Sequence, residues 1–183
     1  TLPTNDFTYF TDYQLYRLYR LMTSIFWFRR SLRLQDNHGL FMALSQNPRV
    51  LPVFIFDTDI LEKLPANDHR VNYIYQTLKK LHQDLTRMGS TLLVLRGKPM
   101  EVFSRLIDTW PIESVYCNAD HEPYGRSRDE KIRALLDSRG IHFHSFTDHL
   151  LMSPNQVLKD DGKPYHVFTP FSRKWKQMLS PSM

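Results

Sequence analysis

The sequence predicts an α/β fold: a Rossmann-like, doubly wound, five-stranded parallel sheet with helices on both faces. Short apolar, β-prone runs alternate along the chain with longer runs whose apolar residues recur at helical spacing. The connections are short, and one β-prone run is almost wholly apolar, as expected for a strand that helices cover on both faces. Such alternation implies βαβ crossovers, which are right-handed in nearly all known proteins.

The first half of the pattern has two strands and two helices. Residues 24–28 are a compact β-prone run, and a polar loop leads from them to a helix over 37–46. The second strand, 50–56, is the run that is nearly all apolar. A long helix follows over 68–88, where one apolar stripe continues until Gly89 ends the helix.

The second half adds three strands and two helices. The third strand is predicted at 91–95. A proline then opens a helix over 99–110, because the first helical position needs no backbone N–H. The fourth strand is predicted at 114–118. A helix over 126–139 ends at a glycine, and the fifth strand follows at 141–146.

Two segments lie outside this pattern and give the expected domain organisation. Residues 1–22 form an N-terminal extension whose tyrosines and leucines suit one short helix. Either this extension is native, or Met22 is the natural start and the preceding residues are not. Residues 23–150 form the α/β domain. Prolines and an Asp-Gly pair then mark turns, so 151–183 is expected to begin an interdomain linker.

Length and composition exclude several classes of protein. The chain has 183 residues, which favours a single domain, and no apolar run approaches the roughly 20 residues that span a bilayer. Cys117 is the only cysteine, which excludes an intramolecular disulfide and a cysteine-based zinc site. His142 and His144 share one face of the fifth strand, with His149 nearby, but a metal site would need a third ligand in reach, so we expect none. We expect a reduced, cytoplasmic protein without a membrane partner, and a net charge of +5 favours an anionic partner only weakly.

Charged residues follow the strands that border the predicted reversal of strand order, where ligands bind in open α/β sheets. The residues expected at this crevice are Arg29, Arg30, Asp57, Asp120, Glu122, Gly125 and Arg128. Arginine stacks on conjugated rings and forms bidentate hydrogen bonds with carboxylates or phosphates, so the set suits a flat ligand with polar edges. Alternatively, the arginines and carboxylates pair with each other and close a loop. The Gly-x-Gly-x-x-Gly, Walker and Gly-x-Ser-x-Gly motifs are missing, which disfavours a dinucleotide-dependent dehydrogenase.

Five segments resemble motifs of the photolyase–cryptochrome family. Residues 27–37, Trp-Phe-Arg-Arg-Ser-Leu-Arg-Leu-Gln-Asp-Asn, closely resemble its opening motif, Trp-x-Arg-x-Asp-Leu-Arg-x-x-Asp-Asn, with Ser31 in place of the usual Asp. The resemblance covers about residues 23–178, and the motifs occur in order and at the right spacing. The four further segments are 52–61, 89–99, 118–129 and 161–171.

The resemblance implies a function that is divided between two domains. In this family a C-terminal helical domain binds FAD and damaged DNA and reverses cyclobutane pyrimidine dimers with light, which makes the full-length protein a deoxyribodipyrimidine photo-lyase. That domain is not in this sequence, so we expect no catalytic residues here and no repair by the chain alone. The partners implied are ultraviolet-damaged DNA and the protein's own FAD domain.

The N-terminal domain of many members holds an antenna chromophore, which passes excitation energy to the flavin. Folate-binding members typically have a Glu where this chain has Gly125. The resemblance therefore favours a deazaflavin or FMN-like antenna over methenyltetrahydrofolate. The contacts implied, position by position, are Arg29, Arg30, Phe54, Asp57, Asp120, Glu122, Gly125 and Arg128.

Two alternatives stay open at this point. The first is a cryptochrome, a blue-light receptor with the same domain and without repair activity. The second is a free-standing flavin- or nucleotide-binding module of the same fold. The residues that would separate a photolyase from a cryptochrome lie beyond this sequence.

Overall fold

The computed structural model describes residues 24–153 and 156–179. The chain divides into two compact units, residues 1–146 and 147–183, and each is described by itself. The helix expected within 1–22 and the alternative start at Met22 lie outside the described residues. Within the described ranges, no helix combines the length and the apolar composition that a bilayer span requires. The same ranges hold no group of three or more His, Cys, Asp or Glu side chains placed to bind a metal ion.

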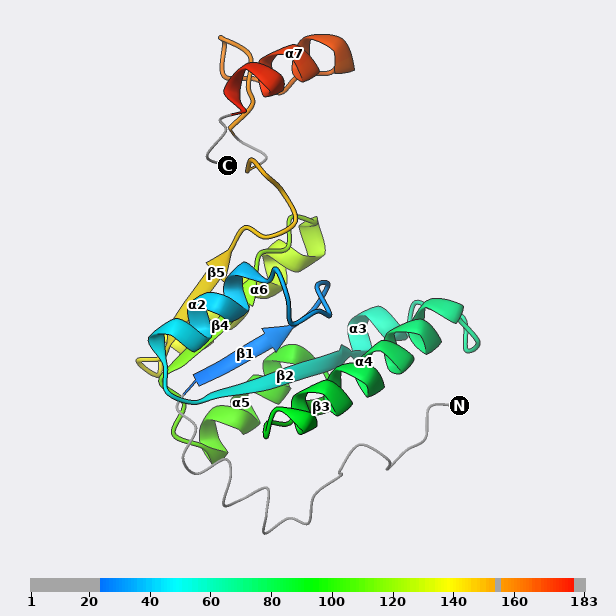
Figure 1. Ribbon diagram of the computed structural model, residues 1–183, viewed down its shortest axis with the longest axis vertical. Helices are drawn as coiled ribbons and strands as arrows, with labels where there is room; N and C mark the ends of the chain where they lie inside the picture. The colour runs from blue at the N-terminus through cyan, green and yellow to red at the C-terminus, as the bar shows by residue number, and fades with distance from the viewer. Residues whose placement is uncertain (1–23, 154–155, 180–183) are drawn as a thin grey trace. The chain divides into compact units, whose positions relative to one another are not determined.

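The first unit contains a five-stranded, all-parallel sheet in the order β3-β2-β1-β4-β5 (Figure 1). The central strand β1 pairs with β2 on one side and with β4 on the other. The chain winds outward through β2 and β3 and then returns to place β4 beside β1, so the predicted reversal of strand order is confirmed. The strands are β1 (Ser24–Phe28), β2 (Val50–Asp57), β3 (Leu93–Gly97), β4 (Ser114–Asn118) and β5 (His142–Phe146).

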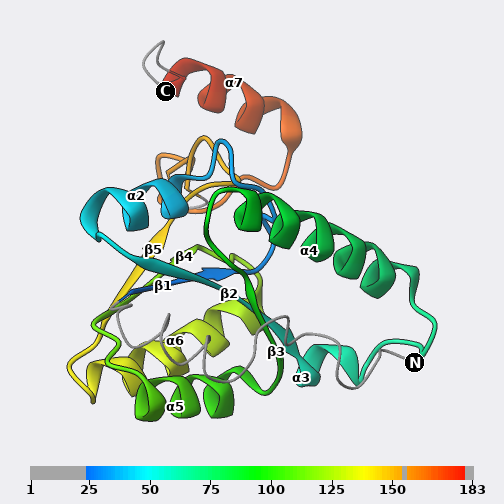
Figure 2. The same ribbon diagram turned by 60° about the horizontal axis from the view of Figure 1, so that its bottom comes forward.

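Helices cover both faces of the sheet, which confirms the doubly wound α/β prediction. Figure 2 shows α2 and α4 on one face and α5 and α6 on the other. The short helix α3 directly follows β2, and α7 belongs to the second unit. The helices are α2 (His38–Gln46), α3 (Thr58–Leu61), α4 (His69–Arg87), α5 (Pro99–Thr109), α6 (Pro123–Asp137) and α7 (Phe168–Met178).

Three local features differ from the sequence prediction. The third strand begins two residues later than predicted, because its pairing with β2 starts where Leu93 meets Val53. Helix α6 begins three residues earlier, at Pro123, whose fixed φ suits the first helical position. Helix α3 was not predicted. Its N-cap is Asp57, whose side chain accepts a hydrogen bond from the Asp59 N–H.

The core consists of two apolar layers, one on each face of the sheet. Alternate side chains of a strand point to opposite faces, so Phe26 and Phe28 pack with residues of α2 and α4. Ile25 and Trp27 pack with residues of α5 and α6. Trp27 is 2% exposed although it lies one residue from the end of its strand. A large aromatic side chain is therefore fixed directly beneath the carboxyl edge of the sheet.

Candidate ligand-binding site

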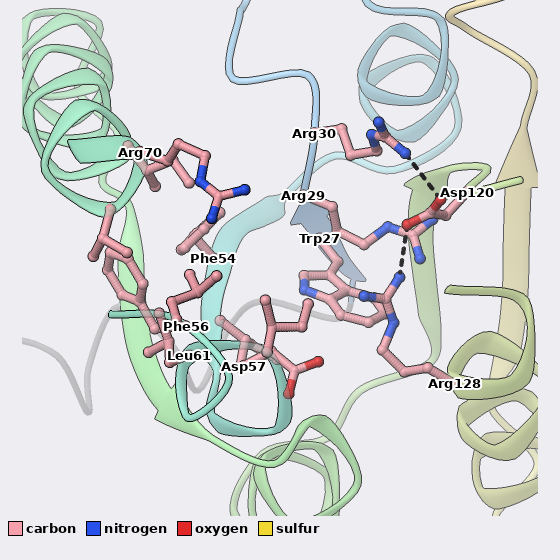
Figure 3. A pocket seen from close by; sticks show the side chains of 15 residues that line it. Trp27, Arg29, Arg30, Phe54, Phe56, Asp57, Leu61, Arg70, Asp120 and Arg128 are labelled. Atoms are coloured by element: carbon pink, nitrogen blue, oxygen red, sulfur yellow. Dashed lines mark hydrogen bonds and ion pairs between the residues drawn. The ribbon is translucent and has the colours of Figure 1, made fainter. Parts of the chain in front are cut away.

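A cavity of about 280 Å³ lies at the carboxyl ends of β1 and β2. Figure 3 shows Phe54 and Arg70 on one side of it and Trp27 and Arg29 on the other. Aromatic residues of β1 and β2 and aliphatic residues of α3 and α4 form its apolar wall. Arginines and carboxylates form its rim. The cavity therefore offers an apolar floor and a polar edge, which is the usual composition of a small-molecule site.

Two guanidinium groups lie against the ring of Trp27 at this cavity. The Arg29 Cζ is 4.7 Å from the ring centroid, and the Arg128 Cζ is 4.9 Å from it. Phe103 of α5 packs edge-on against the same ring, with the centroids 5.0 Å apart. Cations over an indole face are attracted by its electron density, so these contacts hold the ring in one orientation.

The rim arginines form a network of ion pairs with carboxylates that follow β4. Arg29 donates to both carboxylate oxygens of Asp129, at 2.5 and 2.6 Å, and to the carbonyl oxygen of Asn118. Arg128 also pairs with Asp129, at 3.1 Å, and lies 3.5 Å from Asp120. The side chains of Arg29 and Asp129 are only 7% and 15% exposed, so this pair is nearly buried.

The outer part of the network joins Arg30 to the loop after β4. Its Nη1 lies 3.0 Å from Glu122 Oε1 and 3.3 Å from Asp120 Oδ1. The hydrogen bond to Glu122, together with the charges of both carboxylates, raises the pKa of Arg30 although partial burial opposes this. Burial likewise opposes ionisation of Asp120, but the Glu122 N–H and the neighbouring arginines outweigh it and lower the pKa of Asp120. Both groups are therefore charged at neutral pH.

The lowered pKa of Asp120 predicts a loss of stability in acid. A carboxyl whose pKa falls on folding stabilises the protein fully above its unfolded value, 3.8 for Asp120, and loses that effect as the pH falls through the folded value. We expect the difference in free energy of unfolding between the native chain and Asp120→Asn to stay constant from neutral pH to about pH 4 and to shrink below it. Urea unfolding of both proteins across this range checks it. A difference that grows in acid would contradict the prediction.

Asp57 closes the cavity at the end of β2. Its Oδ1 accepts the Asp59 N–H, and its Oδ2 accepts the hydroxyl of Tyr124 at 2.6 Å. Burial, the hydrogen bond to Asp57 and that carboxylate's charge all raise the pKa of Tyr124. The phenol therefore stays protonated and donates to Asp57, which ties the start of α6 to the end of β2.

Gly125 supports the network without lining the cavity. It is buried in the first turn of α6, and a Cβ added there would lie 2.3 Å from the Cγ of Asp120 and 2.7 Å from its Cβ. No other residue leaves room for the Asp120 side chain in its observed position. The glycine thus acts through packing and has no contact of its own with the cavity.

The structure brings together most of the residues that the sequence placed at the crevice. Those that line the cavity are Arg29, Arg30, Phe54, Asp57, Asp120 and Arg128. Glu122 lies outside the lining but contacts Arg30, and Gly125 packs beneath Asp120. The arginines and carboxylates pair with each other and also border a cavity, so the geometry is compatible with both interpretations of the charged residues. The reversal of strand order predicts a crevice between β1 and β4, but the cavity lies at the ends of β1 and β2. The Arg29–Asp129 pair and Arg128 occupy the space between β1 and β4.

Several lining residues were not predicted. The sequence indicates only a packing role for Trp27, and its indole also forms the cavity wall. Arg70 reaches the rim from the first turn of α4, where it pairs with Asp68 at 2.6 Å. One signal could have indicated Arg70. The predicted long helix follows a strand, so its first turn begins near the carboxyl ends of the strands, and Arg70 lies in that turn. The remaining unpredicted residues are Ile55, Phe56, Ile60, Leu61, Leu64, Val71 and Ile74.

Comparison with known proteins gives a consistent result. A family model described as DNA photolyase matches residues 24–183. The deoxyribodipyrimidine photo-lyase of Synechococcus sp. (strain ATCC 27144) is 39% identical over 158 residues, which are 86% of this chain and 33% of that protein. Cryptochromes also match, at about 30% identity. The chain thus spans about a third of the length of the deoxyribodipyrimidine photo-lyases that it matches and about a quarter of the length of the cryptochromes.

Solved structures agree with the sequence comparison. A class III photolyase from Agrobacterium tumefaciens superposes with a TM-score of 0.78 at 28% identity, over 87% of this chain and 33% of that one. A photolyase from Sulfolobus tokodaii, described with two FAD molecules and an implied novel light-harvesting cofactor, gives a TM-score of 0.74 at 35% identity. That match covers 86% of this chain and 35% of the other.

Proposed function

This chain belongs to the DNA photolyase family, and we propose that its α/β domain, residues 23–150, binds an antenna chromophore in the cavity at the ends of β1 and β2. The observation that carries the proposal is the cavity itself: an aromatic floor, a rim of paired arginines and carboxylates, and a position at the carboxyl edge of the sheet, where such folds bind ligands. Its volume of about 280 Å³ is near the lower end for ligand pockets, which suits a flat ring better than a whole dinucleotide.

The residues present fit a conjugated ring with polar edges. Phe54, Phe56 and Trp27 supply aromatic surface, and Arg30 supplies an exposed guanidinium at the rim. Two buried nitrogens beside the cavity, Trp27 Nε1 and Arg29 Nε, have no hydrogen-bond partner among the described residues. Such donors are rare in a finished core, and a ring with acceptor atoms would satisfy them. When bound, the chromophore would absorb light and pass the excitation energy to a flavin.

We favour a deazaflavin or FMN-like antenna over methenyltetrahydrofolate. The support is Gly125, which leaves the Asp120 carboxylate at the rim, whereas the folate-binding pattern has Glu at this position. The two FAD molecules of the Sulfolobus photolyase, with the novel light-harvesting cofactor that they imply there, add support for a flavin ring in a relative of that protein. These arguments concern only the conjugated ring of the chromophore. They set no condition on the tail attached to that ring, which can extend past the rim of the cavity.

For a full-length protein we propose light-driven repair of cyclobutane pyrimidine dimers, with FAD and ultraviolet-damaged DNA held by a C-terminal helical domain in the cytoplasm. Residues 151–183 would then lead toward that domain. The 39% identity to a deoxyribodipyrimidine photo-lyase favours repair over a cryptochrome's signalling role. Residues 1–183 should reverse no dimers under light on their own, and reversal at a rate near that of a whole photolyase would contradict this division of roles.

Titration of the 183-residue chain with FMN, 8-hydroxy-5-deazaflavin and methenyltetrahydrofolate, followed by fluorescence, tests the antenna proposal. We expect FMN or the deazaflavin to bind one to one and more tightly than the folate. Ile60→Asp places a charge in the apolar wall at a position that is 41% exposed, so it should weaken binding without unfolding the chain. Leu44→Asp, at a 59% exposed position of α2 outside the cavity, is the matched control. Binding of the folate alone, or equal affinities for both variants, would refute the proposal.

A further inference from the structure

The indole N–H of Trp27 is a buried donor for which the described residues supply no acceptor. Trp27 is 2% exposed, and its Nε1 has no hydrogen-bond partner among the described residues. More than nine in ten buried polar groups in folded proteins have such a partner, and an unsatisfied one costs about 1–3 kcal/mol. A buried indole N–H of this kind calls for an acceptor from outside the described residues, and a ligand is one that can supply it.

The ring cannot turn to find an acceptor elsewhere. The Arg29 and Arg128 guanidinium groups lie 4.7 and 4.9 Å from the ring centroid, and each is held by the Asp129 carboxylate. Phe103 packs edge-on at 5.0 Å. Trp27 also belongs to β1, the central strand, which is paired with β2 on one side and with β4 on the other. The direction of the N–H bond is thus fixed by the backbone and by three side chains.

That fixed direction leads into the cavity. In Figure 3 the nitrogen of Trp27 is on the side of the ring that faces Phe54 and Phe56, across the cavity. The side chains that form this part of the wall are apolar and offer no acceptor. The edge of the ring that carries the donor therefore faces a cavity that a ligand can occupy.

We propose that Trp27 is a specificity-determining residue, whose Nε1–H donates a hydrogen bond to an acceptor atom at the edge of the bound ring. This inference rests on the proposed antenna function and adds a requirement to it. The ligand ring must carry a carbonyl oxygen or an unprotonated ring nitrogen on the edge that enters the cavity first. An aromatic ring without such an atom would leave the N–H unsatisfied and bind more weakly.

The charges around the cavity support recognition by a neutral acceptor. The rim holds four arginines, Arg29, Arg30, Arg70 and Arg128, and their partners are the four carboxylates Asp68, Asp120, Glu122 and Asp129. These eight groups carry no net charge, and Asp57 adds one more carboxylate to the lining, so the site does not favour an anionic ring over a neutral one. A neutral ring with polar edges, such as the dione ring shared by flavins and 5-deazaflavins, meets both conditions.

Replacement of Trp27 by phenylalanine removes the N–H and keeps an aromatic side chain. We expect Trp27→Phe to bind FMN or 8-hydroxy-5-deazaflavin about 5- to 30-fold more weakly than the native chain, the effect of losing one buried hydrogen bond. Trp110→Phe is the matched control, because Trp110 packs against the core at the end of α5 and does not line the cavity. Its affinity should equal that of the native chain.

A second measurement needs no variant. In ¹H–¹⁵N spectra of the native chain, the indole resonance of Trp27, assigned by its loss in Trp27→Phe, should move to lower field when the ligand binds, as expected for a new hydrogen bond. The Trp110 resonance should not move in this way. A shift together with weaker binding by Trp27→Phe would support the inference.

The outcomes separate this inference from the proposal on which it rests. If the native chain binds the chromophore while Trp27→Phe binds equally well and the indole resonance stays in place, the antenna function stands and the role of Trp27 is refuted. If the native chain binds none of the three chromophores, both are refuted. If Trp27→Phe fails to fold, the indole resonance that persists in both Trp110→Phe and Trp175→Phe is that of Trp27, and its response to the ligand in the native chain decides.

Discussion

Replacing Asp129 by asparagine is expected to lower the free energy of unfolding by about 3–5 kcal/mol. Arg29 and Arg128 are both nearly buried, and both donate to this carboxylate. Removal of one partner of a buried ion pair leaves an uncompensated charge in a region of low dielectric, which costs more than the pair itself contributed. Here a single substitution leaves two guanidinium groups without their main anionic partner.

Asp108→Asn is the matched control for this prediction. Asp108 pairs with Arg139 at 2.9 Å, but both side chains are more than half exposed. A pair of this kind contributes only about 0–1 kcal/mol, so its loss should hardly move the unfolding midpoint. Urea unfolding of the two variants beside the native chain measures the contrast. Equal midpoints for the two variants would show that burial of the Arg29–Asp129 pair has no energetic consequence.

Gly125→Ala is expected to destabilise the chain by about 1–3 kcal/mol and to weaken chromophore binding. In the interior of a helix, alanine normally stabilises relative to glycine by up to about 1 kcal/mol. Here the new Cβ would lie 2.3 Å from the Cγ of Asp120, and Asp120 is too short to move away without a shift of its backbone. Displacement of Asp120 would also break its contacts with Arg30 and Arg128. Helix propensity alone predicts that Gly125→Ala stabilises the chain, so a loss of stability would show that Gly125 packs against Asp120.

Ser127→Ala tests the same helix without the clash. Ser127 is exposed two residues further along α6, so its replacement should be neutral or slightly stabilising. Thermal unfolding and chromophore titration of both variants give the comparison. If Gly125→Ala were as stable as Ser127→Ala, the packing of Asp120 against Gly125 would not be needed for the fold.

The sequence predicted the features of the fold that depend on regular patterns. The strand at 24–28 was placed correctly because a short apolar run between polar segments has few other interpretations, and the reversal of strand order followed from general rules for βαβ topology. Helix α3 was missed because four residues show no helical periodicity. The third strand was predicted two residues too early. Thr91 and Leu92 are buried, as strand residues often are, but they precede the first residue that pairs with β2, and burial alone does not show where pairing begins.

The candidate site was predictable in its charged residues and less so in its apolar ones. Arg30 and Glu122 stand next to strand ends, so topology alone brought them together. Arg70 and Ile60 reach the cavity from helices whose position depends on packing, which a sequence pattern does not show. Nor could the sequence indicate which edge of the Trp27 ring would face the cavity. That depends on two guanidinium groups whose residues lie about a hundred positions apart in the chain.

That separation along the chain would link uptake of the proposed chromophore to completion of the domain. Arg29 lies beside β1, whereas Arg128 and Asp129 enter only after β4 has formed and α6 has followed it. A partly synthesised or partly unfolded chain with β1, β2 and β3 would have the aromatic floor but neither the second guanidinium nor the shared carboxylate. The chromophore should therefore bind only the finished sheet, and at a hundred times its dissociation constant it would stabilise that state by about 2.7 kcal/mol. Chromophore fluorescence could thus report, during synthesis or refolding, the moment at which the two halves of the sheet join.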